Sequence, residues 1–180
     1  MKKTVEIKSK IQYKIIQKKL YNLNKMFLKS QDKVAYYYEE LNHNTVFSFN
    51  ESICFYSASA IKILVCLYLY EQAALKELDL NEKLTIKEED VKQGSGVLKD
   101  RPTGQAYSIE KLVEYTLVES DNTAYIKLVN YVTKEKLIEF GKKLGAEHTL
   151  EGKDLFGITN CHDMRAYWTE LYRFAKEEEL

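Results

Sequence analysis

The sequence predicts an α+β fold that is mostly helical, with a helical subdomain and a partial antiparallel sheet. Apolar residues recur at helical spacing through most of the chain, whereas strand-like composition is confined to residues 33–50. With 180 residues, of which 45% are hydrophobic, the chain can bury one sizeable core. We expect residues 1–55 to form an N-terminal helix and a β-hairpin, and residues 56–180 to form the helical subdomain.

Residues 8–28 are expected to form an amphipathic helix with a lysine-rich outer face. Its apolar positions recur every three to five residues, at Ile11, Ile15, Leu20, Leu23 and Phe27. Residues 1–33 contain ten lysines against two acids, a net charge of +8. This charge fits either a solvated helix face or an arm that binds an anionic partner.

A hairpin is predicted to follow this helix. Lys33–Leu41 and Thr45–Phe49 are rich in aromatic and β-branched residues, and His43-Asn44 lies between them as a turn. We expect the first helix to cover one face of this small sheet.

The most apolar segment of the chain runs from Ser59 to Lys76 and predicts a long helix. Lys62 is its only charge between Ala60 and Tyr70, so the helix is apolar nearly all round and belongs in the middle of a core. The apolar run is shorter than the ~20 residues that cross a bilayer, so no membrane span is expected.

Four further helices complete the predicted subdomain. Ser108 is a good N-cap, and Gly145 is a typical helix end. Glycines at 94, 96 and 104 indicate turns between the helices. The helices cover residues 108–118, 122–132, 134–143 and 164–175.

Charge balance and cysteine spacing exclude several function classes. Lys+Arg equals Asp+Glu at 27 each, so no net field favours nucleic acid. Cys54, Cys66 and Cys161 form no C-x-x-C, and Cys161 beside His162 is poor spacing for zinc, so neither a metal nor another cofactor is expected. No apolar run of signal-peptide length follows the first lysines, so the chain as written is expected in the cytoplasm.

The pattern S-x-x-K occurs three times, at 30–33, 59–62 and 108–111. Only Ser59 opens an apolar helix, where burial would lower the pKa of Lys62 toward a neutral amine that can accept a proton. At i and i+3 the two side chains share one helix face, as an activated serine requires. The same residues also fit a helix cap and a lysine that reaches the surface.

Ser120-Asp-Asn122 interrupts the helical pattern and supplies a second set of polar groups. All three residue types cap helices, so a turn between two helices is one interpretation. In the other, the hydroxyl relays a proton and the carboxamide binds a substrate carbonyl.

Together, S-x-x-K at Ser59 and S-D-N beginning 61 positions later resemble the penicillin-recognising serine hydrolases, most closely the class A β-lactamase-like group. The resemblance covers residues 8–178. It implies that Ser59 is acylated by a β-lactam or a peptidoglycan-like D-alanyl peptide. It further implies Lys62 as proton acceptor, Ser120 as shuttle to the leaving nitrogen and Asn122 as ligand of the acyl amide. Proteins of this group are usually exported.

Two parts of the family pattern are missing after Asn122. No K-T-G or K-S-G follows it, and no E-x-x-L-N follows it to supply the glutamate that activates the deacylating water. We therefore expect a chain that is truncated relative to the family, or a homo-oligomer that completes its sheet by strand exchange. Without the glutamate, an acyl-enzyme would persist.

Three functions stay open at this point. The first is a β-lactamase-like serine hydrolase that uses a Ser59 acyl-enzyme. The second is a module that binds or senses β-lactams or peptidoglycan peptides without turnover. The third is an inactive helical scaffold whose basic N-terminal arm contacts an anionic partner.

Overall fold

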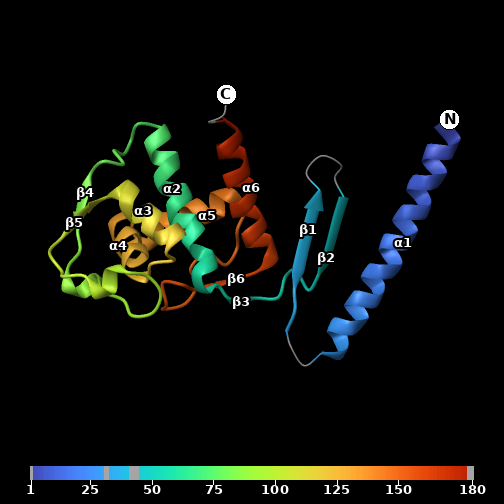
Figure 1. Ribbon diagram of the computed structural model, residues 1–180, viewed down its shortest axis with the longest axis horizontal. Coiled ribbons are helices and arrows are strands. Elements are labelled where there is room, and N and C mark those ends of the chain that lie inside the picture. The colour runs from blue at the N-terminus through green and yellow to red at the C-terminus, as the bar shows by residue number, and fades with distance from the viewer. Residues whose placement is uncertain (1, 31–32, 41–44, 178–180) are drawn as a thin grey trace. The chain divides into compact units, whose positions relative to one another are not determined.

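The computed structural model (Figure 1) describes residues 2–30, 33–40 and 45–177, and divides into two compact units, Met1–Glu51 and Ser52–Leu180. The first unit combines one helix and the second several helices with short antiparallel strands, and helices account for most of the regular structure. The predicted α+β, mostly helical fold class is confirmed. No helix within the described ranges is long and apolar enough to cross a membrane.

The first unit consists of helix α1 (Lys2–Lys29) and a hairpin of strands β1 (Tyr36–Glu40) and β2 (Thr45–Phe49). The strands pair antiparallel, with Tyr36 opposite Phe49 and Glu40 opposite Thr45, as the sequence predicts. The predicted turn at His43-Asn44 lies outside the described residues. Helix α1 begins six residues before the predicted start at residue 8.

An aromatic cluster joins α1 to one face of the hairpin. The ring of Phe27 lies 6.3 Å from that of Tyr36 and 6.0 Å from that of Phe49. The Tyr36 hydroxyl donates to Asn24 Oδ1 at 2.8 Å. Only part of the helix is covered, because a 28-residue helix is about 42 Å long and a five-residue strand about 17 Å. Ile15, on the predicted apolar face, is accordingly 52% exposed.

Helix α2 (Lys62–Ala74) forms the core of the second unit. Its apolar residues are buried on nearly all sides; Leu64 and Leu69, for example, are at most 1% exposed. The predicted start at Ser59 needs a correction, because Ser59 lies in a 3₁₀ turn, η1 (Ala58–Ile61), that leads into α2. The helix also ends before the predicted Lys76, which adopts a positive φ of 61°.

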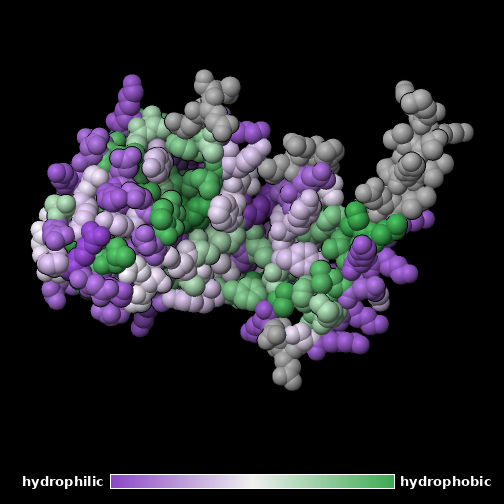
Figure 2. Space-filling view, in the orientation of Figure 1, coloured by the Kyte–Doolittle hydropathy of each residue, from purple (hydrophilic) through white to green (hydrophobic). Residues whose placement is uncertain are grey.

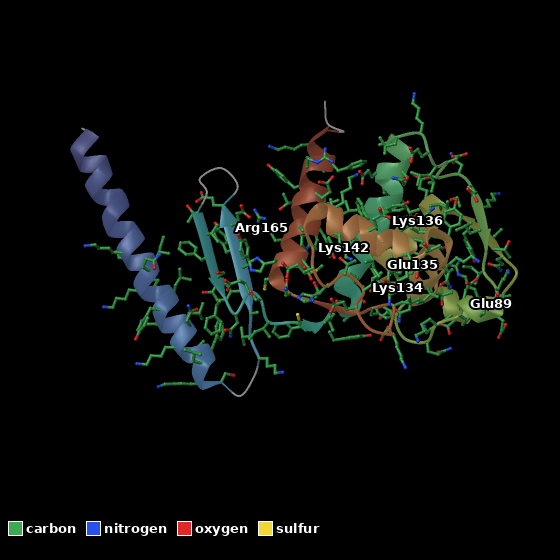
Figure 3. The ribbon with its side chains drawn as sticks, turned by 180° about the vertical axis from the view of Figure 1, so that it is seen from behind. Glu89, Lys134, Glu135, Lys136, Lys142 and Arg165 are labelled. Atoms are coloured by element: carbon green, nitrogen blue, oxygen red, sulfur yellow. The ribbon has the colours of Figure 1, made fainter. Side chains whose placement is uncertain are left out.

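Four helices pack against α2. In chain order they are α3 (Ile109–Val118), α4 (Asn122–Val132), α5 (Lys134–Leu144) and α6 (Cys161–Glu177). The predicted caps are confirmed, since Ser108 Oγ accepts from the backbone N–H of Lys111 at 3.2 Å and Gly145 ends α5 with a φ of 95°. Figure 3 labels Lys136 and Lys142 on the rear of this unit, where α5 presents its exposed charged face.

Two pairs of very short strands were not predicted. Strand β3 (Phe55–Tyr56) pairs with β6 (Ile158–Thr159), and β4 (Lys83–Thr85) pairs with β5 (Ala106–Ser108). Segments of two or three residues are too short for an alternating pattern to stand out in a sequence. Their importance is positional, because the β3–β6 pair brings residues 154–159 beside the chain that leads to Ser59.

Candidate active site

A continuous chain of hydrogen bonds links Lys62, Ser120 and Ser59. The Lys62 ammonium donates to Ser120 Oγ at 3.1 Å, and the Ser120 hydroxyl donates to Ser59 Oγ at 2.9 Å. The i, i+3 spacing of Ser59 and Lys62 suggested a direct contact, but the connection runs through Ser120, which the fold inserts between them. Asn122 joins the same cluster, because its Oδ1 accepts from Lys62 Nζ at 2.8 Å.

Lys62 is buried among aromatic rings and polar oxygens. The residue is 2% exposed, and its Nζ lies 5.9 Å from the ring centre of Tyr125 and 5.7 Å from that of Phe156. Its ammonium also donates to the backbone carbonyl of Ser120. Burial lowers the pKa of Lys62, while the nearby Asp121 carboxylate opposes this shift. The amine therefore loses its proton more readily than an exposed lysine does.

A tight turn between α3 and α4 presents Ser120 and Asn122 to this lysine. Ser120 adopts a positive φ of 49°, which reverses the chain direction after α3. Asp121 then caps α4, accepting from the backbone N–H of Ala124 at 2.9 Å. The S-D-N turn thus joins two helices, and it also brings a hydroxyl and a carboxamide to a buried lysine.

Asp121 has a structural position that the sequence did not reveal. Its side chain is fully buried, and its Oδ2 accepts from the backbone N–H groups of Val97 and Leu98 at 2.6 and 2.7 Å. Three backbone donors satisfy this carboxylate, so it fixes the loop before η3 (Leu98–Asp100) against the start of α4.

Two glycines allow that loop to approach the turn. A Cβ atom on Gly96 would lie 2.2 Å from Asp121 Oδ2, and one on Gly94 would lie 2.6 Å from Asn122 Nδ2. Both have positive φ, at 105° and 111°, a region that residues with side chains rarely adopt. From the sequence, these glycines indicate only a turn. Their close approach to Asp121 and Asn122 could not be predicted, because it depends on contact between segments far apart in the chain.

Two cavities flank Ser59. A polar cavity of about 320 Å³ is lined by Ser59, Asn122, Lys92 and Asp154, among others. An apolar cavity of about 620 Å³ begins at Ser59 and Lys62 and continues between α2, α3 and α6, past Leu117 and Trp168. Figure 2 shows apolar side chains gathered around a hollow beside α2. A ligand bound at Ser59 would thus have one charged and one apolar surface next to it.

The other two S-x-x-K sequences have no comparable surroundings. Lys33 is exposed in the first unit, and Lys111 pairs with Glu114 at 2.7 Å at the surface of α3. Within the described part of the chain, no group of three or more His, Cys, Asp or Glu residues could hold a metal ion.

The chain belongs to the beta-lactamase enzyme family, whose model matches residues 17–179. This is a family of serine hydrolases. A search of curated proteins finds no match to the sequence.

Several solved structures share the fold of this chain. PBP-A has a TM-score of 0.80 and 17% identity over 86% of this chain and 61% of its own. A β-lactamase from Sphaerobacter thermophilus has a TM-score of 0.67 and 23% identity, over 72% of this chain and 53% of its own. The D-alanyl-D-alanine carboxypeptidase DacD from Francisella tularensis has a TM-score of 0.65 and 19% identity, over 79% and 38%. The chain thus spans less than two thirds of each of these proteins.

Proposed function

We propose that this protein is a serine hydrolase in which Ser59 is acylated by a β-lactam or a D-alanyl peptide. The observation that carries the proposal is the hydrogen-bond chain from a buried lysine through Ser120 to Ser59. A variant of PBP-A, a protein with the same fold, has been described as an acyl-enzyme complex with penicillin G. Similarity of fold does not establish activity, so the proposal depends on the site itself.

In the acylation step, Ser59 Oγ attacks the carbonyl carbon of the β-lactam and forms an ester bond. Its proton passes to Ser120, and the proton of Ser120 passes to Lys62. The lactam C–N bond then breaks: Ser120 donates its hydroxyl proton to the leaving nitrogen and is reprotonated by Lys62, which becomes neutral again. The whole penicillin stays attached, since the opened ring remains part of the acyl group.

Lys62 is suited to the role of base because it is buried. In the hydrogen-bonded arrangement the amine donates to three oxygens, which corresponds to its protonated form. When Lys62 is neutral, both hydroxyl groups can rotate so that Ser59 donates to Ser120 and Ser120 donates to the amine. The lowered pKa of Lys62 increases the fraction of enzyme in that reactive form.

Asn122 and the backbone around Ser59 would hold the substrate. The carboxamide of Asn122 is fixed from both ends, because Oδ1 accepts from Lys62 and Nδ2 donates to the carbonyl of Gln93 at 3.0 Å. We assign its remaining N–H to the carbonyl of the substrate's acyl amide. The backbone N–H of Ser59 is assigned as one donor to the oxyanion that forms during attack.

A binding or sensing module without turnover is the second candidate. Its support is the sequence after Asn122, where no E-x-x-L-N supplies a glutamate to activate a deacylating water. Acylation without rapid hydrolysis would convert the protein into a stable covalent adduct. The two candidates share the first chemical step and differ in the lifetime of the ester.

Intact-protein mass spectrometry after incubation with penicillin G tests the shared step. We expect a mass increase equal to the whole penicillin molecule, which Ser59→Ala abolishes and the matched variant Ser108→Ala retains. No adduct in the native chain, or an adduct that persists in Ser59→Ala, would refute the proposal. Return of the native mass with time then distinguishes the hydrolase from the module without turnover.

A further inference from the structure

The polar cavity beside Ser59 carries opposite charges on two different walls. We propose that this cavity binds a zwitterionic amino-acid group, with one ammonium and one carboxylate, on the acyl part of the substrate. Lys92 would bind the carboxylate and Asp154 the ammonium. The inference extends the proposed function, since it names a substrate feature that the Ser59 site would select.

The first wall is the segment around Lys92, which is held firmly against α4. The backbone N–H of Lys92 donates to Thr123 Oγ1 at 3.0 Å. Two residues earlier, the carboxylate of Asp90, 3% exposed, forms an ion pair with Lys127 at 3.0 Å. These contacts fix the backbone at Lys92, while its side chain is exposed and lines the cavity.

The second wall contains Asp154 and is held against β3. The Tyr56 hydroxyl donates to Asp154 Oδ2 at 2.9 Å, and the backbone N–H of Phe156 donates to Oδ1 at 2.9 Å. The next peptide is anchored as well, because the Tyr125 hydroxyl donates to the carbonyl of Leu155 at 2.6 Å. The carboxylate is thus oriented before a ligand arrives.

Neither charge forms an ion pair with another described side chain. Among the ion pairs of residues 14–30, 33–40 and 45–176, none involves Lys92 or Asp154. Both donors to Asp154 are neutral groups, so its negative charge is oriented but not compensated. A zwitterionic group could form an ion pair with Lys92 and with Asp154 at once, whereas a group with a single charge could pair with only one of them.

The position of Asn122 indicates which part of the substrate enters the cavity. Asn122 lines the cavity together with Ser59, and its free N–H is assigned above to the acyl amide. The substituent that continues from that amide therefore lies between Lys92 and Asp154. The bond that breaks lies on the other side of Ser59, toward Lys62 and Ser120.

Two penicillins with the same bicyclic nucleus provide the test. Penicillin N has a side chain that ends in an amino-acid group, and penicillin G has a neutral aromatic side chain. Equilibrium dissociation constants are measured for both by ligand-observed NMR in Ser59→Ala, in which no ester can form. We expect penicillin N to bind about tenfold more tightly, because two partly exposed charge pairs each contribute a few-fold.

Charge-neutralising variants in the same background locate the preference. We expect Asp154→Asn and Lys92→Gln each to reduce the ratio of the two dissociation constants about threefold. The matched surface variants Asp100→Asn and Lys83→Gln should leave the ratio unchanged. Higher ionic strength should also reduce the ratio, because partly exposed charge pairs are screened by salt.

The outcomes separate this inference from the proposed function. A ratio near one, a ratio insensitive to both charge variants, or no measurable binding of penicillin N would overturn the zwitterion site. The proposed function is tested separately, by the penicillin G adduct of the native chain. An adduct with no preference between the penicillins would refute only the inference, and a preference without an adduct would refute only the acylation.

Discussion

The same four-residue pattern, S-x-x-K, occurs at 59–62 and at 108–111 in very different surroundings. Lys62 is 2% exposed and donates to three oxygens. The Lys111 side chain is 41% exposed and pairs with Glu114. Burial lowers the pKa of Lys62, whereas the hydrogen bond to Glu114 raises that of Lys111. The pattern sets the spacing of the two side chains, and the environment determines whether the lysine can act as a base.

The two serines differ in the same way. Ser108 Oγ accepts from the backbone at the start of α3, so its hydroxyl is used for capping. Neither η1 nor α2 has a side-chain cap, so Ser59 is not used in this manner and its hydroxyl faces Ser120. The Ser108 hydroxyl is thus bound to the backbone of α3, whereas the Ser59 hydroxyl is bound to Ser120.

The largest difference in acylation rate between the two S-x-x-K sites is expected when the lysine amine of each is removed in turn. Lys62→Met should lower the rate of acylation by penicillin G about 10²–10⁴-fold, the usual contribution of a positioned proton acceptor. Lys111→Met should leave the rate unchanged. Rates are measured by the growth of the adduct mass, with circular dichroism to show that both variants fold. Equal rates in the two variants would remove Lys62 from the mechanism.

Replacing Ser120 should have the next largest effect. Ser120→Ala interrupts the chain between Ser59 and Lys62, and we expect acylation to slow about 10²-fold. A water molecule in the vacated space could restore part of the relay, which is why the loss should not exceed that of Lys62→Met. Thr116→Ser, a buried hydroxyl one turn earlier on α3, is the control. A Ser120→Ala rate equal to that of the native protein would show direct transfer to Lys62.

The pH profile of acylation should reveal the buried amine. Lys62 must be neutral to accept a proton, so the rate should rise about tenfold per pH unit below its pKa and then level off. Because burial lowers this pKa, the midpoint should lie below the ordinary lysine value of 10.5. A stopped-flow measurement with a fluorescent penicillin gives the profile. A rate that does not change with pH would argue against Lys62 as the base.

The smallest expected effect concerns stability. Ser108→Ala should lower the free energy of unfolding by about 1 kcal/mol, because it removes the cap of α3. Ser59→Ala should change it by less, since this hydroxyl caps no helix. Urea denaturation of both variants provides the comparison. A larger loss in Ser59→Ala would indicate that its hydroxyl stabilises the fold rather than serving a reaction.

Much of the fold could be predicted because it depends on local signals. The boundaries of α4 match the prediction at both ends, and the caps at Ser108 and Gly145 are where expected. The short strands β3 and β6 were missed, because their pairing joins residues about a hundred positions apart. The bent entry to α2 was missed for a similar reason. Ala58 has a φ of 46°, which its sequence does not favour, and the residue before it, Ser57, donates its backbone N–H to the distant carbonyl of Gly157 at 3.1 Å.

The candidate site was predicted in part. Ser59, Lys62, Ser120 and Asn122 could be selected because their spacing resembles a known family, and the structure brings them into one hydrogen-bonded cluster. Asp154 could not be selected, because it enters the site only through the β3–β6 pairing and its bond to Tyr56. Residues that a long-range contact brings to a site leave no pattern in the local sequence.

The buried carboxylate of Asp121 has a consequence for how this protein could diversify. It accepts hydrogen bonds from the backbone of Val97 and Leu98, in the loop that follows Lys92, and it also caps α4, the helix that carries Asn122. A change in loop length near Gly96 would therefore displace the Asn122 amide, to which we assign the substrate carbonyl. New substrate preferences should arise more readily on the Asp154 side, where side chains can vary without disturbing the hydrogen bonds that link Lys62, Ser120 and Ser59.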